Sequence, residues 1–355
     1  LFLILIILLI ISQSKQEISG IVTEHVFIME QNRPYLSFVV VGRNDNYGHR
    51  FLYRFQRFLD NLIYFCEKYK LNSEIIIVEW NPPEKNKRLY EDLKILKNKK
   101  YAKIRFIKVP NKIHKTLENS DKFFLFEYIG KNVGIRRAKG DFVLITNPDI
   151  IFNEILIKYL SKKNLKKDYI YRIGRCDMDK DIPENIKIRR LDRFCKKNYL
   201  SYSGRYFTWA YHNSIKFFIK HNLIYLSNSI KKFIAAHFFY KKYPSVKYHG
   251  GAPGDFILMH KKDWERIEGF PELKVLSGID GYAVNIAVSK GIKMKFLQFP
   301  KRIYHQFHEK PGGRPLYDNK KYNKDIIRMI IKKERIKFNF SDWGLFDRKL
   351  EERIF

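Results

Sequence analysis

Runs of apolar residues alternate with amphipathic stretches through the first half of the chain. Tyr35 to Val41 is predicted to be a buried strand and Glu74 to Trp80 a second strand, because each is a largely apolar run, and Ile104 to Val109 is predicted as a third strand. Residues 50–70 repeat Phe and Leu at three- and four-residue spacing, which predicts a helix with one apolar face. A lysine-rich helix is expected near 85–97. This β-α-β-α order predicts a parallel, doubly wound sheet with right-handed crossovers.

Residues 131–152 (KNVGIRRAKGDFVLITNPDIIF) are the stretch around which we expect the chain to be organised. A helix over 124–138 and a turn at Gly140 lead into the apolar run Phe142 to Ile145, predicted as an inner strand. Ligands of open α/β sheets bind beyond the carboxyl ends of the strands. Asp149, which follows this strand, is therefore placed to hold a metal-bound phosphate, although Asn-Pro-Asp is also typical of an ordinary turn.

The second half predicts shorter elements of both kinds. A stretch over 215–243 fits one or two amphipathic helices, which form either a membrane-surface or lipid-acceptor patch or simply pack on the sheet. The other predicted elements are a helix capped by Asn153 and running to 163, strands over 169–173, 254–260 and 293–299, and helices over 261–267, 282–290 and 319–333.

The chain is strongly basic, with 69 Lys and Arg against 37 Asp and Glu and a net charge of +32. Such a charge suits polyanions, and it also follows from a general bias toward lysine. No nucleic-acid-binding motif is present, so we expect peripheral contact with an anionic membrane and no nucleic acid partner. The three cysteines share no CxxC spacing, which argues against a disulfide framework and a cysteine zinc site.

The first eleven residues form one apolar run that is too short to span a bilayer, which takes about 20 residues. The run is either the remnant of a signal peptide or anchor, or an extension ahead of a start at Met29. Residues 1–28 are left out of the predicted fold on both interpretations. The expected location is the cytoplasm, with peripheral attachment to the membrane, and with anchoring if the first segment is real.

One reaction class matches the candidate chemistry. A transferase that uses a nucleotide-diphosphate donor needs a cation or fixed positive charge against the leaving diphosphate, and a base for the acceptor hydroxyl. Asp149 with His305 or His308 is the candidate metal site, and the imidazoles favour manganese over magnesium. Asp280 is the candidate base, with an N-cap as its alternative role. The candidate nucleotide contacts at the strand ends and in a Gly-Gly loop are Arg43, Asp45, Glu79 and Arg314.

With these motifs the chain resembles the GT-A fold glycosyltransferases, in the family 2-like and galactosyltransferase-like branch. The resemblance rests on FVVVGRND, IIIVEW, NVGIRRAKGDFVLITNPDIIF, GAPGDFILMHKKDWERIEGFPE, LSGIDGYAVNIAVSKG and IYHQFH, in that order. It implies an α/β fold of the GT-A, Rossmann-like kind: a mostly parallel sheet with helices on both faces, a helical acceptor-side insertion and a C-terminal helical tail. It also implies a nucleotide-sugar donor, a glycan or lipid-linked acceptor and a divalent cation, Mn²⁺ or Mg²⁺.

The resemblance also assigns roles to individual residues. Residues 147–149 stand where the family has its Asp-x-Asp metal motif, with Asn147 replacing the first aspartate and Asp149 keeping the metal contact. Glu79 takes the place of the acidic residue that contacts base and ribose, and Asp280 that of the base of inverting members. The full set of expected nucleotide-sugar contacts is Gly42, Arg43, Asp45, Glu79, Asn132, Asn147 and Arg314.

These inferences predict a GT-A domain over 29–310, with a nucleotide-binding half at 35–152 and an acceptor half at 169–308, followed by a lid loop and helical tail at 311–355. The expected reaction is metal-dependent sugar transfer by direct displacement with inversion. Two alternatives stay open: a nucleotidyltransferase on a similar sheet, and a non-enzymatic basic protein that binds polyanions. Glycoside hydrolysis also uses paired carboxylates, but it needs no nucleotide-binding half.

Overall fold

The computed structural model describes residues 33–202, 205–206, 223, 226–227, 230, 254–273, 279–309, 324–325, 328–329, 332 and 334–355. Residues Tyr35–Phe355 form one compact unit, which is the part described below. Within the described residues, no helix combines the length and apolar character needed to cross a membrane.

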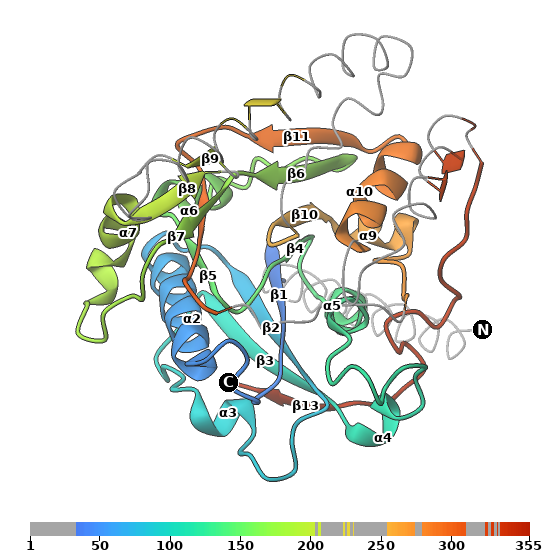
Figure 1. Ribbon diagram of the computed structural model, residues 1–355, viewed down its shortest axis with the longest axis horizontal. Helices are drawn as coiled ribbons and strands as arrows, with labels where there is room; N and C mark the ends of the chain where they lie inside the picture. Colours follow the sequence, from blue (N-terminus) through green and yellow to red (C-terminus); the bar gives the residue numbers. More distant parts are fainter. Residues whose placement is uncertain are drawn as a thin grey trace, which may run out of the picture. The chain divides into compact units, whose positions relative to one another are not determined.

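A sheet of eight strands forms the centre of the unit, in the order β11-β6-β10-β4-β1-β2-β3-β13 (Figure 1). Its strands are β1 (Leu36–Gly42), β2 (Ser73–Trp80), β3 (Ala102–Val109), β4 (Phe142–Ile145), β6 (Tyr169–Ile173), β10 (Ile257–His260), β11 (Lys293–Leu297) and β13 (Glu351–Ile354). The four strands β4-β1-β2-β3 are parallel, as predicted. On its other side β4 pairs with β10 in the antiparallel direction.

Helices cover both faces of this sheet (Figure 1). They are α2 (Phe51–Lys68), α3 (Leu89–Asp92), α4 (Asn111–His114), α5 (Glu127–Arg137), α6 (Glu154–Leu160), α7 (Ile188–Lys197), α9 (Lys261–Ile267) and α10 (Ile279–Ser289). One core lies under α2 and α6, and a second lies under α5, α9 and α10. The α/β class and the mostly parallel, Rossmann-like sheet covered on both faces, expected for a GT-A fold, are confirmed.

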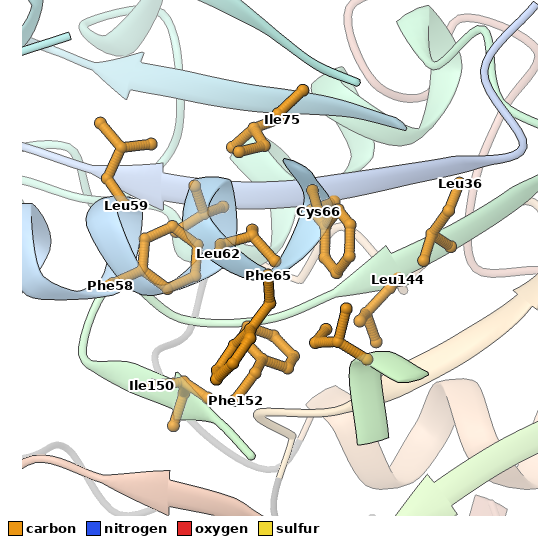
Figure 2. Close-up of a cluster of buried hydrophobic side chains, with 14 of the residues drawn as sticks. Leu36, Phe58, Leu59, Leu62, Phe65, Cys66, Ile75, Leu144, Ile150 and Phe152 are labelled. Carbon is orange, nitrogen blue, oxygen red and sulfur yellow. The ribbon is translucent and has the colours of Figure 1, made fainter. Parts of the chain in front are cut away.

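The apolar face of α2 shows why the helix packs where it does. Phe58, Leu62 and Phe65, at three- and four-residue spacing, lie over the strand residues Leu36 and Leu144 (Figure 2). All five side chains are buried. Burying one side chain of this size contributes about 1.5–3 kcal/mol to the stability of the fold. The apolar face of α2 therefore holds this helix against β1 and β4.

The structure also contains a second sheet, of five strands, which was not predicted from the sequence. Its order is β5-β12-β7-β8-β9, with β5 (Ile150–Phe152), β12 (Ile303–His305), β7 (Arg175–Met178), β8 (Tyr199–Tyr202) and β9 (Arg205–Tyr206). These strands are two to four residues long and carry polar as well as apolar side chains. Their pairing joins segments far apart in sequence, so no local pattern marks them.

Several predicted boundaries need correction. The helix expected over 85–97 is shorter in the structure, where α3 spans four residues. The lysines of this stretch provide no apolar face, and Leu89 is the buried residue of α3. The helix after Asn153 ends at Leu160, but the predicted cap is confirmed, since Asn153 Oδ1 accepts from Leu156 N at 2.9 Å. Most of the helices expected over 215–243 and 319–333 lies outside the described residues.

Candidate metal centre and its surroundings

Asp149 lies in the turn that connects the eight-stranded sheet, at β4, to the five-stranded sheet, at β5. Its carbonyl oxygen accepts from Gln306 N at 2.9 Å, which fixes its backbone beside the segment that follows β12. Antiparallel pairing of β5 with β12 sets Ile150 opposite His305. The second sheet therefore brings His305, which is 156 residues further along the chain than Asp149 (305 − 149), to the end of β4.

Asp149, His305 and His308 form one cluster. Asp149 Oδ2 lies 3.4 Å from His305 Nε2 and 3.3 Å from His308 Nε2. One ligand atom from each residue lies within 4.8 Å of the others, the usual arrangement of side chains that hold a metal ion. The sequence predicted this grouping from residues far apart in the chain, and both histidines, rather than one of them, take part.

An observation that does not depend on the sequence motif also shows that the cluster suits a divalent cation. Asp149 Oδ1 is buried and has no hydrogen-bond partner among the described residues. A buried polar atom without a partner costs about 1–3 kcal/mol, and a bound cation would remove that cost. A carboxylate with two imidazoles suits manganese and other first-row transition metals better than magnesium, which prefers oxygen ligands.

The Asp149 carboxyl and the His305 ring shift each other's pKa values. Burial by itself would raise the pKa of the Asp149 carboxyl, but the two histidines outweigh burial and hold that pKa well below its usual range. Burial would likewise lower the pKa of His305, yet the charge of Asp149 outweighs it and raises that pKa. The fold therefore favours the ionised aspartate, and a metal ion would compete with a proton for His305.

Asn147, two residues before Asp149, faces a different set of polar groups. Its Oδ1 accepts from Lys131 Nζ at 2.8 Å, and its Nδ2 donates to Asp255 Oδ1 at 2.7 Å. Asp255 in turn accepts from Arg175 Nη1 at 2.7 Å. Lys131, Arg175 and Asp255 were not predicted from the sequence to lie here, although the acid beside the buried strand in GDFILMH was a signal for Asp255.

Asp280 lies in the first turn of α10, half-buried, beside the same group of residues. A Cβ built on Gly254 would come within 3.0 Å of Asp280 Oδ2, so the aspartate packs directly against the residue that precedes Asp255. Tyr128 bonds to the Asp280 backbone; burial first, and then the Asp280 charge, raise the tyrosine pKa. Among the described residues, the Asp280 carboxylate has no hydrogen-bond or ion-pair partner.

Two of the expected nucleotide contacts lie partly exposed at the carboxyl edge of β1. Arg43 and Asp45 form an ion pair of 2.7 Å with side chains 13% and 30% exposed, and the Arg43 guanidinium lies over the Phe124 ring. Gly42 ends β1, where a Cβ would lie 3.0 Å from the Phe55 ring, so packing explains this glycine. Arg314 lies outside the described residues.

Glu79 and Asn132, also predicted to contact the nucleotide-sugar, have no exposed surface. Glu79 accepts from the Arg88 side chain and from Leu89 N, which fixes the start of α3. Asn132 exchanges two hydrogen bonds of 2.8 Å with the backbone of Phe270. In this structure both side chains are buried and hold loops in place, and their contact with a nucleotide-sugar stays a prediction.

The loop after β1 reaches the metal cluster, which the sequence analysis did not anticipate. The Tyr47 ring lies 5.8 Å from the His308 ring. Gly48 has φ +63°, and a Cβ there would come within 2.8 Å of His308 Nδ1. The buried Arg54 donates to Tyr47 O at 2.6 Å and to Gly48 O at 3.1 Å, so α2 fixes this loop. The Tyr-Gly pair after GRND was the available signal.

No protein-family model and no curated protein sequence matches the chain. Among solved structures, S. aureus TarS 1–349 is 12% identical with a TM-score of 0.42, covering 84% of this chain and 64% of that one. GalNAc-T7 with UDP, GalNAc and Mn²⁺ is 11% identical with a TM-score of 0.45, covering 85% of this chain and 50% of that one. This chain therefore spans less than two thirds of each. Identities and TM-scores at this level do not establish membership of a family.

Proposed function

We propose that this chain is a GT-A glycosyltransferase, which moves a sugar from a nucleotide-sugar donor to a hydroxyl of a glycan or lipid-linked acceptor. The observation that carries the proposal is the cluster of Asp149, His305 and His308 beyond the carboxyl end of β4, where one buried aspartate oxygen has no hydrogen-bond partner within the part of the chain that the structure describes. The loop that follows β1 lies against this cluster. Beyond the strand ends is where α/β sheets bind nucleotides.

Asp149, His305 and His308 would hold the cation, which is Mn²⁺ or Mg²⁺ with manganese favoured by the two imidazoles. When bound, the cation stabilises the negative charge that grows on the leaving diphosphate. The proposed donor contacts are those expected from the sequence: Gly42, Arg43, Asp45, Glu79, Asn132, Asn147 and Arg314. Glu79 and Asn132 also hold loops in place.

Asp280 would act as the base that removes the proton of the acceptor hydroxyl during direct displacement with inversion. Its carboxylate has no partner among the described residues, which supports this role. It lies beside Gly254 and Asp255, and Asp255 bonds to Asn147, so the proposed base belongs to the same group of side chains as the turn that carries Asp149.

The wider assignments follow from the same proposal. Residues 35–152 would form the nucleotide-binding half and 169–308 the acceptor half of one domain over 29–310, followed by a lid loop and tail at 311–355. The described end of that tail, 334–355, contains the strand β13 and no helix, which corrects the expected helical tail for these residues. The protein would work in the cytoplasm, in peripheral contact with anionic membrane through its positive charge. If the apolar segment within 1–28 is real, it would add an anchor.

The reaction itself is tested by turnover of a nucleotide-sugar with two variants. Asp280→Asn removes the base and keeps the shape, so transfer should fall about 10²–10⁴-fold. Asp149→Ala removes the carboxylate that both histidines face and that would ligate the metal. Transfer should fall by at least about 10²-fold. Asp168→Asn, an exposed acid on Arg266, is the matched control and should keep full activity. Undiminished transfer by both site variants would refute the mechanism.

The released product and a binding screen separate the alternatives. A glycosyltransferase releases a nucleoside diphosphate, whereas a nucleotidyltransferase releases pyrophosphate. A thermal-shift screen of nucleoside diphosphates and nucleotide-sugars, with and without Mn²⁺, reports the donor class and the metal dependence together. A non-enzymatic polyanion-binding protein would show no donor-induced shift and would bind nucleic acid with a steep dependence on salt.

A further inference from the structure

Asp177 lies on the far side of His305 from Asp149. It belongs to β7, whose parallel pairing with β12 sets Asp177 opposite His305. Asp177 Oδ1 is 3.7 Å from His305 Nδ1, while Asp149 Oδ2 is 3.4 Å from His305 Nε2. The two ring nitrogens of one histidine therefore face two different carboxylates.

The Asp177 carboxylate is itself held in place. Ser201 Oγ, from the neighbouring strand β8, donates to Asp177 Oδ2 at 2.8 Å. Arg175 Nε lies 2.9 Å from Asp177 Oδ1. A carboxylate fixed by two donors keeps one orientation toward the histidine ring, and its negative charge stays next to Nδ1.

This arrangement matters when His305 binds a cation. A nitrogen that ligates a metal has to supply a lone pair, so the proton of the neutral ring must sit on the other nitrogen. Histidine ligands commonly donate that second N–H to a carboxylate, which orients the ring and makes the ligating nitrogen more basic. Here Nε2 faces Asp149 and His308, and Nδ1 faces Asp177.

We infer that Asp177 is a positioning residue, which keeps the proton of His305 on Nδ1 and directs Nε2 to the metal. The inference rests on the proposed function, because it concerns the same metal site. Asp177 is not itself a ligand in this arrangement: the cluster found among the described residues contains Asp149, His305 and His308. A purely structural role, as partner of Arg175, is the competing explanation.

Binding of Mn²⁺ alone, measured by calorimetry without any donor, tests the inference. Asp177→Asn keeps the shape and removes the charge, and we expect it to weaken Mn²⁺ binding about 10- to 100-fold. Asp181→Asn is the matched control: it removes the same charge from the exposed contact with Arg50 and should bind as the unaltered protein does. Ser201→Ala keeps the carboxylate but removes one of its holders, and should weaken binding by a smaller factor.

A spectroscopic measurement distinguishes positioning from structural support. With diamagnetic Zn²⁺ bound, the Nδ1 proton of His305 should give a downfield nuclear magnetic resonance signal that exchanges slowly with water. In Asp177→Asn this proton should move upfield and exchange faster. A merely structural aspartate would leave the signal unchanged. If Asp177→Asn does not fold, Ser201→Ala carries the same comparison.

The outcomes separate this inference from the proposed function. Mn²⁺ binding by Asp177→Asn equal to that of the unaltered protein overturns the inference and leaves sugar transfer untouched. Mn²⁺ binding that depends on Asp177, in a protein that transfers no sugar, supports the inference and refutes the proposed reaction. If the unaltered protein binds neither cation, the inference falls together with the metal site.

Discussion

At the scale of single residues, the Asp149 and His305 pair combines two opposite pKa shifts in one contact. The pKa of Asp149 lies below its ordinary value of 3.8, because the histidines outweigh the effect of burial. The pKa of His305 lies above its ordinary value of 6.5, because the Asp149 charge outweighs burial. Each shift means that the folded chain favours the charged form of that residue, so the pair stabilises the metal-free fold only where both groups are charged.

The sign of each shift sets the pH range of this stabilisation. The Asp149 contribution is present above about pH 4 and is lost as pH falls through its lowered pKa. The His305 contribution is present below about pH 6.5 and is lost as pH rises through its raised pKa. In the presence of a chelator, His305→Gln should therefore lower the Tm most between about pH 4 and 6.5, with the difference shrinking at alkaline pH.

His260, whose pKa is shifted in the opposite direction to that of His305, provides the control for that experiment. Burial lowers the pKa of His260, which caps α9 by accepting from Lys262 N. Its contribution should be full above about pH 6.5 and be lost as pH falls, so the Tm difference for His260→Gln should grow with rising pH. Parallel pH profiles for the two variants would contradict the assigned shifts.

At the scale of elements, α5 and β1 are held at an unusually close distance, and this contact bears on the site. Gly130 and Gly134, one helical turn apart, face Val41 and Val39 of β1. Between these glycines lies the fully buried Lys131, whose ammonium reaches Asn147. Since the glycines allow the approach, they also set where Lys131 lies relative to the turn after β4.

Gly134→Ala should lower the free energy of unfolding. A Cβ at Gly134 would lie 2.3 Å from Val39 Cγ1, against 2.8 Å from Val41 Cγ1 at Gly130. Alanine gains about 1 kcal/mol of helix propensity over glycine, but overpacking in a core costs about 1–3 kcal/mol. We expect the clash to win at Gly134 and to cost less at Gly130, measured by denaturant unfolding of both variants. A stabilised Gly134→Ala protein would show that α5 moves freely away from β1.

The parts of the fold that were predicted correctly carry strong local patterns. Largely apolar runs marked β1, β2 and β4, and the helical spacing of Phe and Leu marked α2. His305 was placed at the site by its chemistry, not by β12, which is three residues long. Glu79 and Asn132 illustrate the limit: spacing does not determine whether a polar side chain is buried, and both are fully buried with their polar atoms bonded to neighbouring loops.

At the scale of the whole molecule, the end of the chain covers an edge of the main sheet. The strand β13 pairs with β3 in the antiparallel direction, and the two lie side by side in Figure 1. The sequence EERI is polar and short, so it was not predicted as a strand. Arg105 of β3, almost fully buried, bonds to Glu352 at 2.6 Å and to Glu74 at 2.6 Å. Backbone pairing and the ion pair between the buried Arg105 and the exposed Glu352 thus hold this strand.

Deleting residues 351–355 should expose the edge of β3. An uncovered edge strand offers free N–H and C=O groups to another chain, so the shortened protein should self-associate with rising concentration in sedimentation experiments. Glu352→Gln keeps the strand and weakens the contact with Arg105; it should cost about 1–3 kcal/mol in unfolding free energy without self-association. Mn²⁺ binding should survive in both variants, because none of the described contacts of β13 involves Asp149, His305 or His308. A shortened protein that stays unassociated would mean that charged side chains on β3, such as Lys103 and Lys108, protect the edge without β13.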